Sequence, residues 1–163
     1  MSSFKMKLPA TLLFFFFLLS TISAHAQSEN NSSSETSENS IVIDILNDPS
    51  IQWHPGPDFM PEGIQLAFLQ GNPEDKNIDV LFKMPANSKA PNHWHNSQER
   101  MVLISGELTV QYEGEEPSTL KPGYYAYGPS KKPHTAECGD AGPCILYIAF
   151  VAPLDAFPME VKN

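Results

Sequence analysis

Basic residues are scarce in this chain, which has 10 lysines and arginines against 19 aspartates and glutamates in 163 residues. The net charge of −9 repels phosphate groups, so nucleic acids and anionic membranes are excluded as partners. The sequence also lacks a G-x-S-x-G motif, a phosphate-binding loop and an internal repeat. These common motifs therefore suggest no function for the chain, and candidate functional residues must be found by other patterns.

An apolar run long enough to cross a bilayer is missing as well. Residues 12–19 are apolar, but a spanning helix needs roughly 20 such residues. Lys5 and Lys7 precede this run and small residues follow it up to Ala26, a pattern typical of a secretory signal peptide over residues 1–26. The alternatives are a buried N-terminal helix or an uncleaved anchor. We expect export to the periplasm or the medium, with no membrane contact after cleavage.

Residues 27–40 contain no apolar side chain and are rich in serine and glutamate. Such a segment has nothing to bury against a core, so it is predicted to be a disordered polar linker. Residues 41–163 remain as one domain, long enough to enclose one core.

Short apolar or alternating runs recur through this domain, and turn-forming residues separate them. This pattern predicts an all-β sandwich or barrel, and the 15 prolines leave little room for a long helix. The expected strands lie at residues 41–45, 63–69, 78–84, 101–112, 123–127 and 144–152.

The segment PNHWHNSQER contains two histidines two positions apart and a glutamate four positions later. On a strand, His93 and His95 face the same side. A straight strand would carry Glu99 about 13 Å past His95, but a three-residue hairpin loop at residues 96–98 would return it. Glu99 would then lie opposite His95, with Met101 opposite His93, and the three polar side chains would converge.

A fourth ligand is expected from another part of the fold. His134 precedes a strand-like run, whereas His54 lies in a proline-rich loop. Because strands hold ligands well in place, His134 is preferred over His54.

These residues resemble the two sequence motifs of the cupin family. Residues 87–106 match G-x5-H-x-H-x3-E-x6-G through His93, His95, Glu99 and Gly106, with Asn87 in place of the first glycine. Residues 123–138 resemble G-x5-P-x-G-x2-H-x3-N through Gly123, Pro129 and His134, with Lys131 and Cys138 as departures. Asn87 and Lys131 suggest altered turns. The resemblance covers most of residues 41–153 and implies a single-domain double-stranded β-helix, or jelly roll.

The resemblance also implies one divalent transition metal, held by His93, His95, Glu99 and His134. This ligand set suits iron, manganese, nickel, copper or zinc. The alternative, four polar side chains inside an apolar barrel without an ion, would leave them poorly satisfied.

Side chains near this centre are candidate pocket residues. If Glu99 faces inward, Met101 and Leu103 follow it on the same face, Phe82 or Leu81 joins from a neighbouring strand, and Tyr125 or Tyr127 supplies a hydroxyl. The alternative for each of these residues is ordinary core packing.

Cys138 and Cys144 bracket a turn-like GDAGP segment. Export and symmetric placement across a short loop favour a disulfide between them. The alternative places Cys138 near the metal as a free thiol.

Two function classes remain open from the sequence. One is an enzyme acting on a small organic molecule, with dioxygenase- or isomerase-type chemistry. The other is a non-catalytic module that binds a metal or a small ligand. A homodimer is also considered, formed through residues 41–46 as an edge strand.

Overall fold

The computed structural model describes residues 40–159, and the signal peptide and most of the linker expected above lie outside them. The described residues contain eleven strands and no helix, and no helix long and apolar enough to cross a membrane is found among them. The strands are β1 (His54–Pro55), β2 (Gln65–Gln70), β3 (Ile78–Met84), β4 (Lys89–Trp94), β5 (Glu99–Ser105), β6 (Leu108–Tyr112), β7 (Ser118–Leu120), β8 (Tyr125–Gly128), β9 (His134–Cys138), β10 (Cys144–Phe150) and β11 (Phe157–Pro158).

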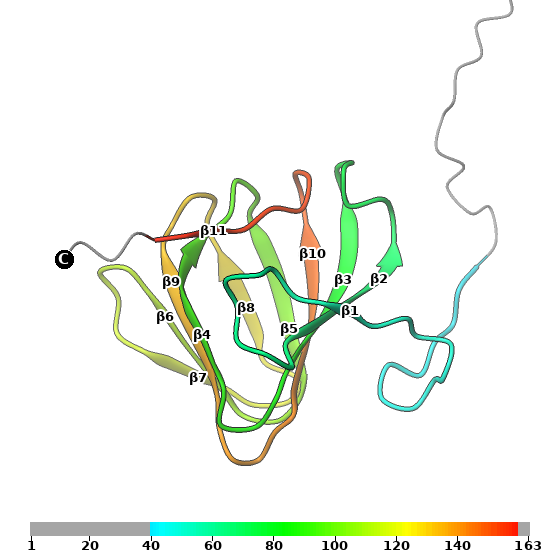
Figure 1. The fold of residues 1–163 in the computed structure, drawn as a ribbon, viewed down its shortest axis with the longest axis horizontal. Coiled ribbons are helices and arrows are strands. Elements are labelled where there is room, and N and C mark those ends of the chain that lie inside the picture. The colour runs from blue at the N-terminus through cyan, green and yellow to red at the C-terminus, as the bar shows by residue number, and fades with distance from the viewer. Residues whose placement is uncertain (1–39, 160–163) are drawn as a thin grey trace, which may run out of the picture. The chain divides into compact units, whose positions relative to one another are not determined.

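The strands form two antiparallel sheets (Figure 1). One has the order β1-β2-β3-β10-β5-β8 and the other the order β11-β4-β9-β6-β7. The chain passes repeatedly from one sheet to the other, as in a jelly roll. The expected all-β jelly-roll fold is confirmed.

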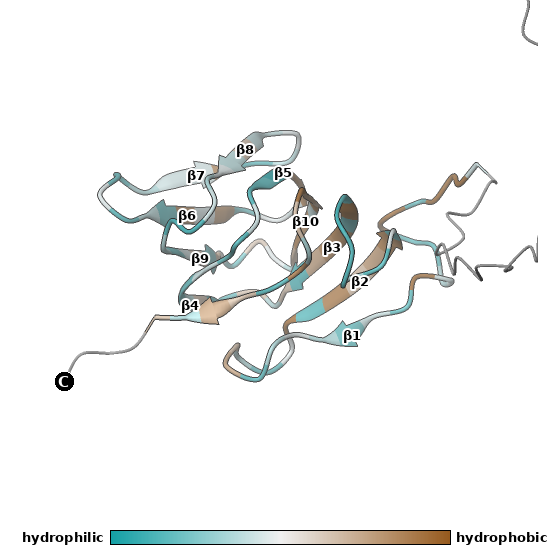
Figure 2. Cartoon of the chain, turned by 90° about the horizontal axis from the view of Figure 1, so that it is seen from above, coloured by the Kyte–Doolittle hydropathy of each residue, from teal (hydrophilic) through white to brown (hydrophobic). Residues whose placement is uncertain are grey.

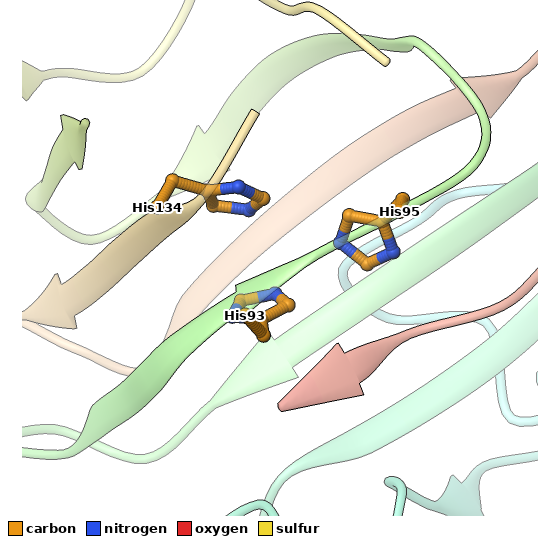
Figure 3. Close-up of side chains that lie close together, drawn as sticks. All are labelled: His93, His95 and His134. Carbon is orange, nitrogen blue, oxygen red and sulfur yellow. The ribbon is translucent and has the colours of Figure 1, made fainter. Parts of the chain in front are cut away.

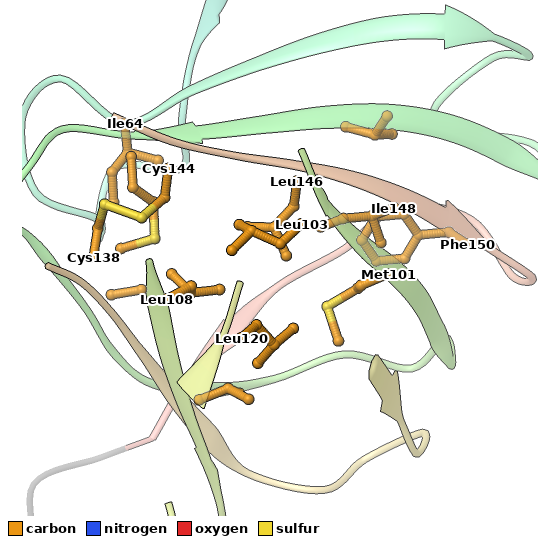
Figure 4. Packing of buried hydrophobic residues seen from close by; sticks show 14 of the residues in the cluster. Ile64, Met101, Leu103, Leu108, Leu120, Cys138, Cys144, Leu146, Ile148 and Phe150 are labelled. Carbon is orange, nitrogen blue, oxygen red and sulfur yellow. A yellow bond between two sulfur atoms is a disulfide. The ribbon is translucent and has the colours of Figure 1, made fainter. Parts of the chain in front are cut away.

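The core lies between the two sheets and is built from alternate positions of the strands. Leu103 of β5 pairs in register with Leu146 of β10, and both are buried with Leu108 and Leu120 of the facing sheet (Figure 4). Each such side chain contributes about 1.5–3 kcal/mol when it leaves water. Strands β3 and β10, with the sequences IDVLFKM and CILYIAF, carry long hydrophobic stretches (Figure 2).

The prediction of a strand at residues 41–45 is wrong. Residues 40–44 have no regular structure and residues 45–47 form a turn. Ile41 and Val42 are exposed, whereas Ile45 packs with Ile51 and Trp53 against an outer cluster that includes Leu81 of β3. In the single chain residues 41–46 form no strand, and the homodimer considered through them stays a prediction.

Two turns that depart from the cupin motifs keep the backbone that a glycine would adopt. Asn87 and Lys131 have φ values of 59° and 61°, in the left-handed region that side chains other than glycine rarely enter. Gly106 and Gly123 also have positive φ values, of 83° and 87°. Asn87 and Lys131 thus adopt a conformation that glycine also favours, and the altered turns expected at these two positions stay a prediction.

A disulfide joins Cys138, at the end of β9, to Cys144, at the start of β10. Their Cα atoms are 5.8 Å apart, and both residues are buried. Because β9 and β10 belong to different sheets, the bridge connects the sheets at one end of the core. A Cβ atom at Gly106 would lie 2.8 Å from the Sγ of Cys144, so the closing glycine of the first motif makes room for the bridge. The predicted disulfide is confirmed.

Candidate metal centre

Three histidine side chains meet on the inner face of the second sheet (Figure 3). His93 on β4 lies directly opposite His134 on β9 in the antiparallel pair, and His95 follows the last residue of β4. The ring centroids of His93 and His134 are 4.3 Å apart, and those of His93 and His95 are 4.9 Å apart. One nitrogen from each ring lies within 4.8 Å of the other two, so the predicted histidine cluster forms.

Backbone carbonyl groups fix the orientation of all three rings. The Nδ1 of His93 bonds to the carbonyl oxygen of Pro91 at 2.7 Å, and that of His134 bonds to the carbonyl of Lys132 at 3.1 Å. The Nδ1 of His95 bonds to the carbonyl oxygen of Asp155. Because a carbonyl only accepts hydrogen bonds, each Nδ1 carries a proton, and in a neutral imidazole the lone pair is then on Nε2. This arrangement is typical of imidazoles that bind metals.

Glu99, the first residue of β5, faces this cluster from the other sheet. Its Oε1 lies 3.5 Å from the Nε2 of His95, and its Oε2 lies 3.6 Å from the Nε2 of His134. When ligand bonds are about 2.1 Å long, two donor atoms on one ion are roughly 3.0 to 4.2 Å apart. The two distances from Glu99 fall in this range, while the group of ligand atoms that lie within 4.8 Å of one another contains the three histidines and not Glu99.

The route by which Glu99 reaches the histidines differs from the predicted hairpin. Strands β4 and β5 belong to different sheets, and Glu99 pairs with Gly128 and Phe150 instead of His95. Residues 95–98 cross from one sheet to the other. Ser97 fixes this crossing, because its buried hydroxyl accepts hydrogen bonds from the backbone N–H groups of Val151 and Ala152 at 2.8 and 3.0 Å.

Burial keeps His93 and His134 uncharged. It lowers the pKa of His93 to about 4 and that of His134 to about 3, and the neighbouring histidines lower both further. Burial also raises the pKa of Glu99, an effect that the charge of His95 partly opposes. At neutral pH the imidazoles of His93 and His134 are therefore in the neutral form that a metal ion requires.

These shifts predict that the metal-free protein loses stability in mild acid. The folded-state pKa values of His93 and His134 lie below the unfolded value of 6.5, so the unfolded chain binds more protons as the pH falls below 6.5. Each histidine contributes a slope of about 1.4 kcal/mol per pH unit, and the raised pKa of Glu99 offsets part of it. We expect a loss of about 1–3 kcal/mol between pH 6.5 and 5.5, measured by urea unfolding with a chelator.

A matched pair of variants isolates the origin of this slope. His134→Asn is expected to flatten the pH dependence, because the buried titrating group is gone. His54→Asn changes an exposed residue and is expected to leave the slope unchanged. Equal slopes for the wild type and His134→Asn would contradict the assignment.

A cavity of about 260 Å³ opens beside the cluster, between the two sheets. Phe82 and Met101 line it, as predicted. Leu103 is fully buried in the core but does not line the cavity. The exposed fractions of Tyr125 and Tyr127 are 63% and 50%, and neither residue lines the cavity, so the hydroxyl expected from one of them is not there.

The alternation of inward and outward side chains along β8 explains why the two tyrosines do not line the cavity. Alternate residues of a strand face opposite sides, and Ala126 and Gly128 occupy the inner side. A Cβ atom at Gly128 would lie only 2.8 Å from the Oε2 of Glu99, so a small residue is required there. The two tyrosines consequently face outward.

The hydroxyl in the cavity belongs to Tyr112 on β6, which the sequence reasoning missed. Tyr112 lies opposite His134 in the β6–β9 pair, with ring centroids 5.0 Å apart. Leu108, Val110 and Tyr112 alternate inward along β6. That alternation in the sequence LTVQY was the signal that could have found it.

His54 lies outside the histidine cluster. It is exposed on β1, and its ring lies 5.5 Å from that of Phe68. This position agrees with the preference for His134.

The described residues have the jelly-roll fold of the cupins, with a histidine cluster between the two sheets. The structure is similar to an RmlC-like cupin from Shewanella frigidimarina, with a TM-score of 0.53 and 17% identity over 63% of this chain and 86% of that one. It is also similar to the polyketide cyclase RemF from Streptomyces resistomycificus, with a TM-score of 0.59 and 14% identity over 75% of this chain and 89% of that one.

A model of the family DUF4437, a domain of unknown function, matches residues 20–150, and the chain belongs to this family. A curated relative is the dimethylsulfoniopropionate lyase DddQ of Ruegeria pomeroyi, 28% identical over 107 residues, which are 64% of this chain and 53% of that protein. The crystal structure of DddQ gives a TM-score of 0.57 and 22% identity over 66% of this chain and 60% of that one. The chain spans about half the length of the curated relatives that it matches.

Proposed function

We propose that this protein is a metal-dependent enzyme that acts on a small organic molecule in the cavity between its sheets. The observation that carries the proposal is the position of the histidine cluster, which is buried and yet lines a cavity of about 260 Å³. A purely structural metal site has all its positions filled by protein ligands, whereas a catalytic site keeps one open. The likeness to DddQ, whose name gives a lyase activity on a small molecule, supports the proposal.

In this proposal His93, His95 and His134 hold the ion, and Glu99 either binds it as a further ligand, with a position still open for the substrate, or moves a proton next to it. A bound divalent ion supplies Lewis-acid activation of an oxygen-bearing substrate, or redox chemistry when the metal is iron, manganese or copper. The apolar walls exclude water and strengthen these interactions. Elimination and isomerisation both need such a proton transfer, and dioxygenation needs the redox metal.

An open position on the metal can be tested with cobalt(II), whose visible absorption reports its ligands. We expect the cobalt-loaded protein to change its spectrum when azide is added, because azide occupies the open position. A spectrum that does not respond to azide would indicate a closed structural site and contradict the proposal.

Turnover separates an enzyme from a binding module. The protein loaded with iron, manganese, nickel, copper or zinc would be mixed with small carboxylates, diketones, phenols and dimethylsulfoniopropionate, with and without oxygen. We expect at least one compound to be converted in a reaction that a chelator stops. A centre that responds to azide but converts none of these compounds favours the non-catalytic module.

We also propose that the protein functions in an oxidising compartment outside the cytoplasm. The buried disulfide between Cys138 and Cys144 supports this location, since such bridges persist where thiols are oxidised. The signal peptide predicted for residues 1–26 agrees with it.

A further inference from the structure

The walls of the cavity are hydrocarbon over most of their area. Both sheets contribute, through Leu66 and Phe82 on β2 and β3, Val110 and Leu120 on β6 and β7, and Leu146 and Ile148 on β10. A ligand that fills this space must therefore present a body without polar groups, since any hydroxyl or charge set against these walls would lose its hydrogen bonds to water.

Polar side chains line the cavity only at its histidine end. Among the described lining residues, no lysine, arginine, serine, threonine, asparagine or glutamine is present, and the polar members besides the three histidines are Glu99, Tyr112 and Asp155. The carboxylate of Asp155 already accepts hydrogen bonds from the backbone and the side-chain amide of Asn96, at 2.9 and 2.7 Å. Apart from the three histidines and Glu99, Tyr112 is therefore the lining side chain that can form a hydrogen bond to a ligand.

The hydroxyl of Tyr112 lies close to the carboxylate of Glu99. A Cβ atom built on Gly128 would be 2.6 Å from the Tyr112 hydroxyl and 2.8 Å from the Oε2 of Glu99, so both groups border the same small space. The hydroxyl is buried and has no hydrogen-bond partner within residues 40–159. A ligand oxygen next to the metal centre would accept its hydrogen bond.

Charge limits the ligand as well. Three neutral imidazoles and the Glu99 carboxylate leave a divalent ion with one net positive charge, which a single anionic group would neutralise. A second charge on the ligand would lie against hydrocarbon with no partner.

The volume of the cavity limits the size of the ligand's hydrocarbon part. An apolar cavity of about 150 Å³ accommodates benzene, so 260 Å³ corresponds to a ligand of roughly ten non-hydrogen atoms.

We propose that the cavity binds a small monocarboxylate with an uncharged hydrocarbon body. One carboxylate oxygen faces the histidine cluster, and the other accepts a hydrogen bond from Tyr112. This inference rests on the proposed function and adds the substrate class to it.

Two compounds of nearly the same shape test the uncharged body. Dimethylsulfoniopropionate carries a sulfonium at the end of its chain, and 4-methylpentanoate has a neutral CH group in its place. The zinc content of the protein would be measured first, and each compound would then be titrated into the zinc-loaded protein by calorimetry. We expect 4-methylpentanoate to bind at least tenfold more tightly, because its branched end stays uncharged among the apolar side chains.

Substitution of Tyr112 tests the second contact. Tyr112→Phe is expected to weaken the binding of 4-methylpentanoate about tenfold while the zinc content stays the same. Tyr127→Phe removes an exposed hydroxyl and is expected to bind like the wild type.

The outcomes separate this inference from the proposed function. A protein that takes up no zinc contradicts the proposed function, and the inference falls with it. A zinc-loaded protein that binds neither compound, or that binds dimethylsulfoniopropionate as tightly as 4-methylpentanoate, overturns the inference alone. Unchanged affinity in Tyr112→Phe overturns the role of that hydroxyl.

Discussion

Replacing His95 by alanine is expected to remove stoichiometric metal binding from the folded protein. The Nδ1 of His95 is held by the Asp155 carbonyl, and its Nε2 lies 3.5 Å from the Glu99 carboxylate. The cluster among the described residues has only His93 and His134 besides it, so no further histidine takes its place. Loss of a residue that merely orients a ligand costs 10- to 100-fold in metal affinity. Loss of the ligand itself should therefore cost more than about 100-fold, measured by dialysis against zinc and elemental analysis.

The control for this experiment is His54→Ala. His54 is exposed and lies outside the cluster, so this variant is expected to keep one equivalent of zinc. Circular dichroism would establish that both variants are folded. A full equivalent of metal in His95→Ala, or its loss from His54→Ala, would contradict the assignment of the ligands.

Removal of the disulfide is expected to be the most destabilising change away from the metal centre. The bridge between Cys138 and Cys144 closes a short loop, with a sequence separation of 6, and limits the freedom of the unfolded chain. Disulfides typically contribute 2–4 kcal/mol in this way. We expect Cys138→Ala/Cys144→Ala to lower the free energy of unfolding by about 2–4 kcal/mol, measured with urea.

A reducing agent supplies the matched comparison. It should lower the stability of the wild type toward that of the double variant and leave the double variant unchanged. Two titratable thiols in unfolded, unreduced protein from its own compartment would show instead that the bridge is absent there.

The strands that could be predicted were those whose own sequence is strongly apolar. The runs at residues 78–84 and 144–152 contain β3 and β10, because one face of each strand is largely buried and the other is at least half-buried. Strand β4, with the sequence KAPNHW, has a proline and an irregular register between Ala90 and His93. Nothing in its composition separates it from a loop, and only its partners β9 and β11 make it a strand.

The candidate site was predicted in its residues but not in its geometry. The motif spacing identified His93, His95, Glu99 and His134, and these four side chains do lie together. The local turn signal at residues 96–98 suggested a hairpin, yet the segment connects two different sheets. A turn signal carries no information about which strand the chain pairs with next, since that depends on contacts far away in the sequence.

The pocket residues show a similar limit. Alternation places Tyr125 and Tyr127 on one face of a strand but does not say which face is inside. The inner face was decided by Glu99 and Tyr112, which occupy the space beside Gly128. Such a decision depends on distant side chains, so the sequence of β8 alone could not supply it.

The central claim of this account is that three histidines bind one divalent ion between the sheets. X-ray absorption of the dialysed, zinc-loaded protein would test it most directly. The account predicts one equivalent of zinc with three imidazole nitrogens at about 2.0–2.1 Å. Zinc surrounded only by oxygen, or zinc that dialysis removes, would contradict the claim.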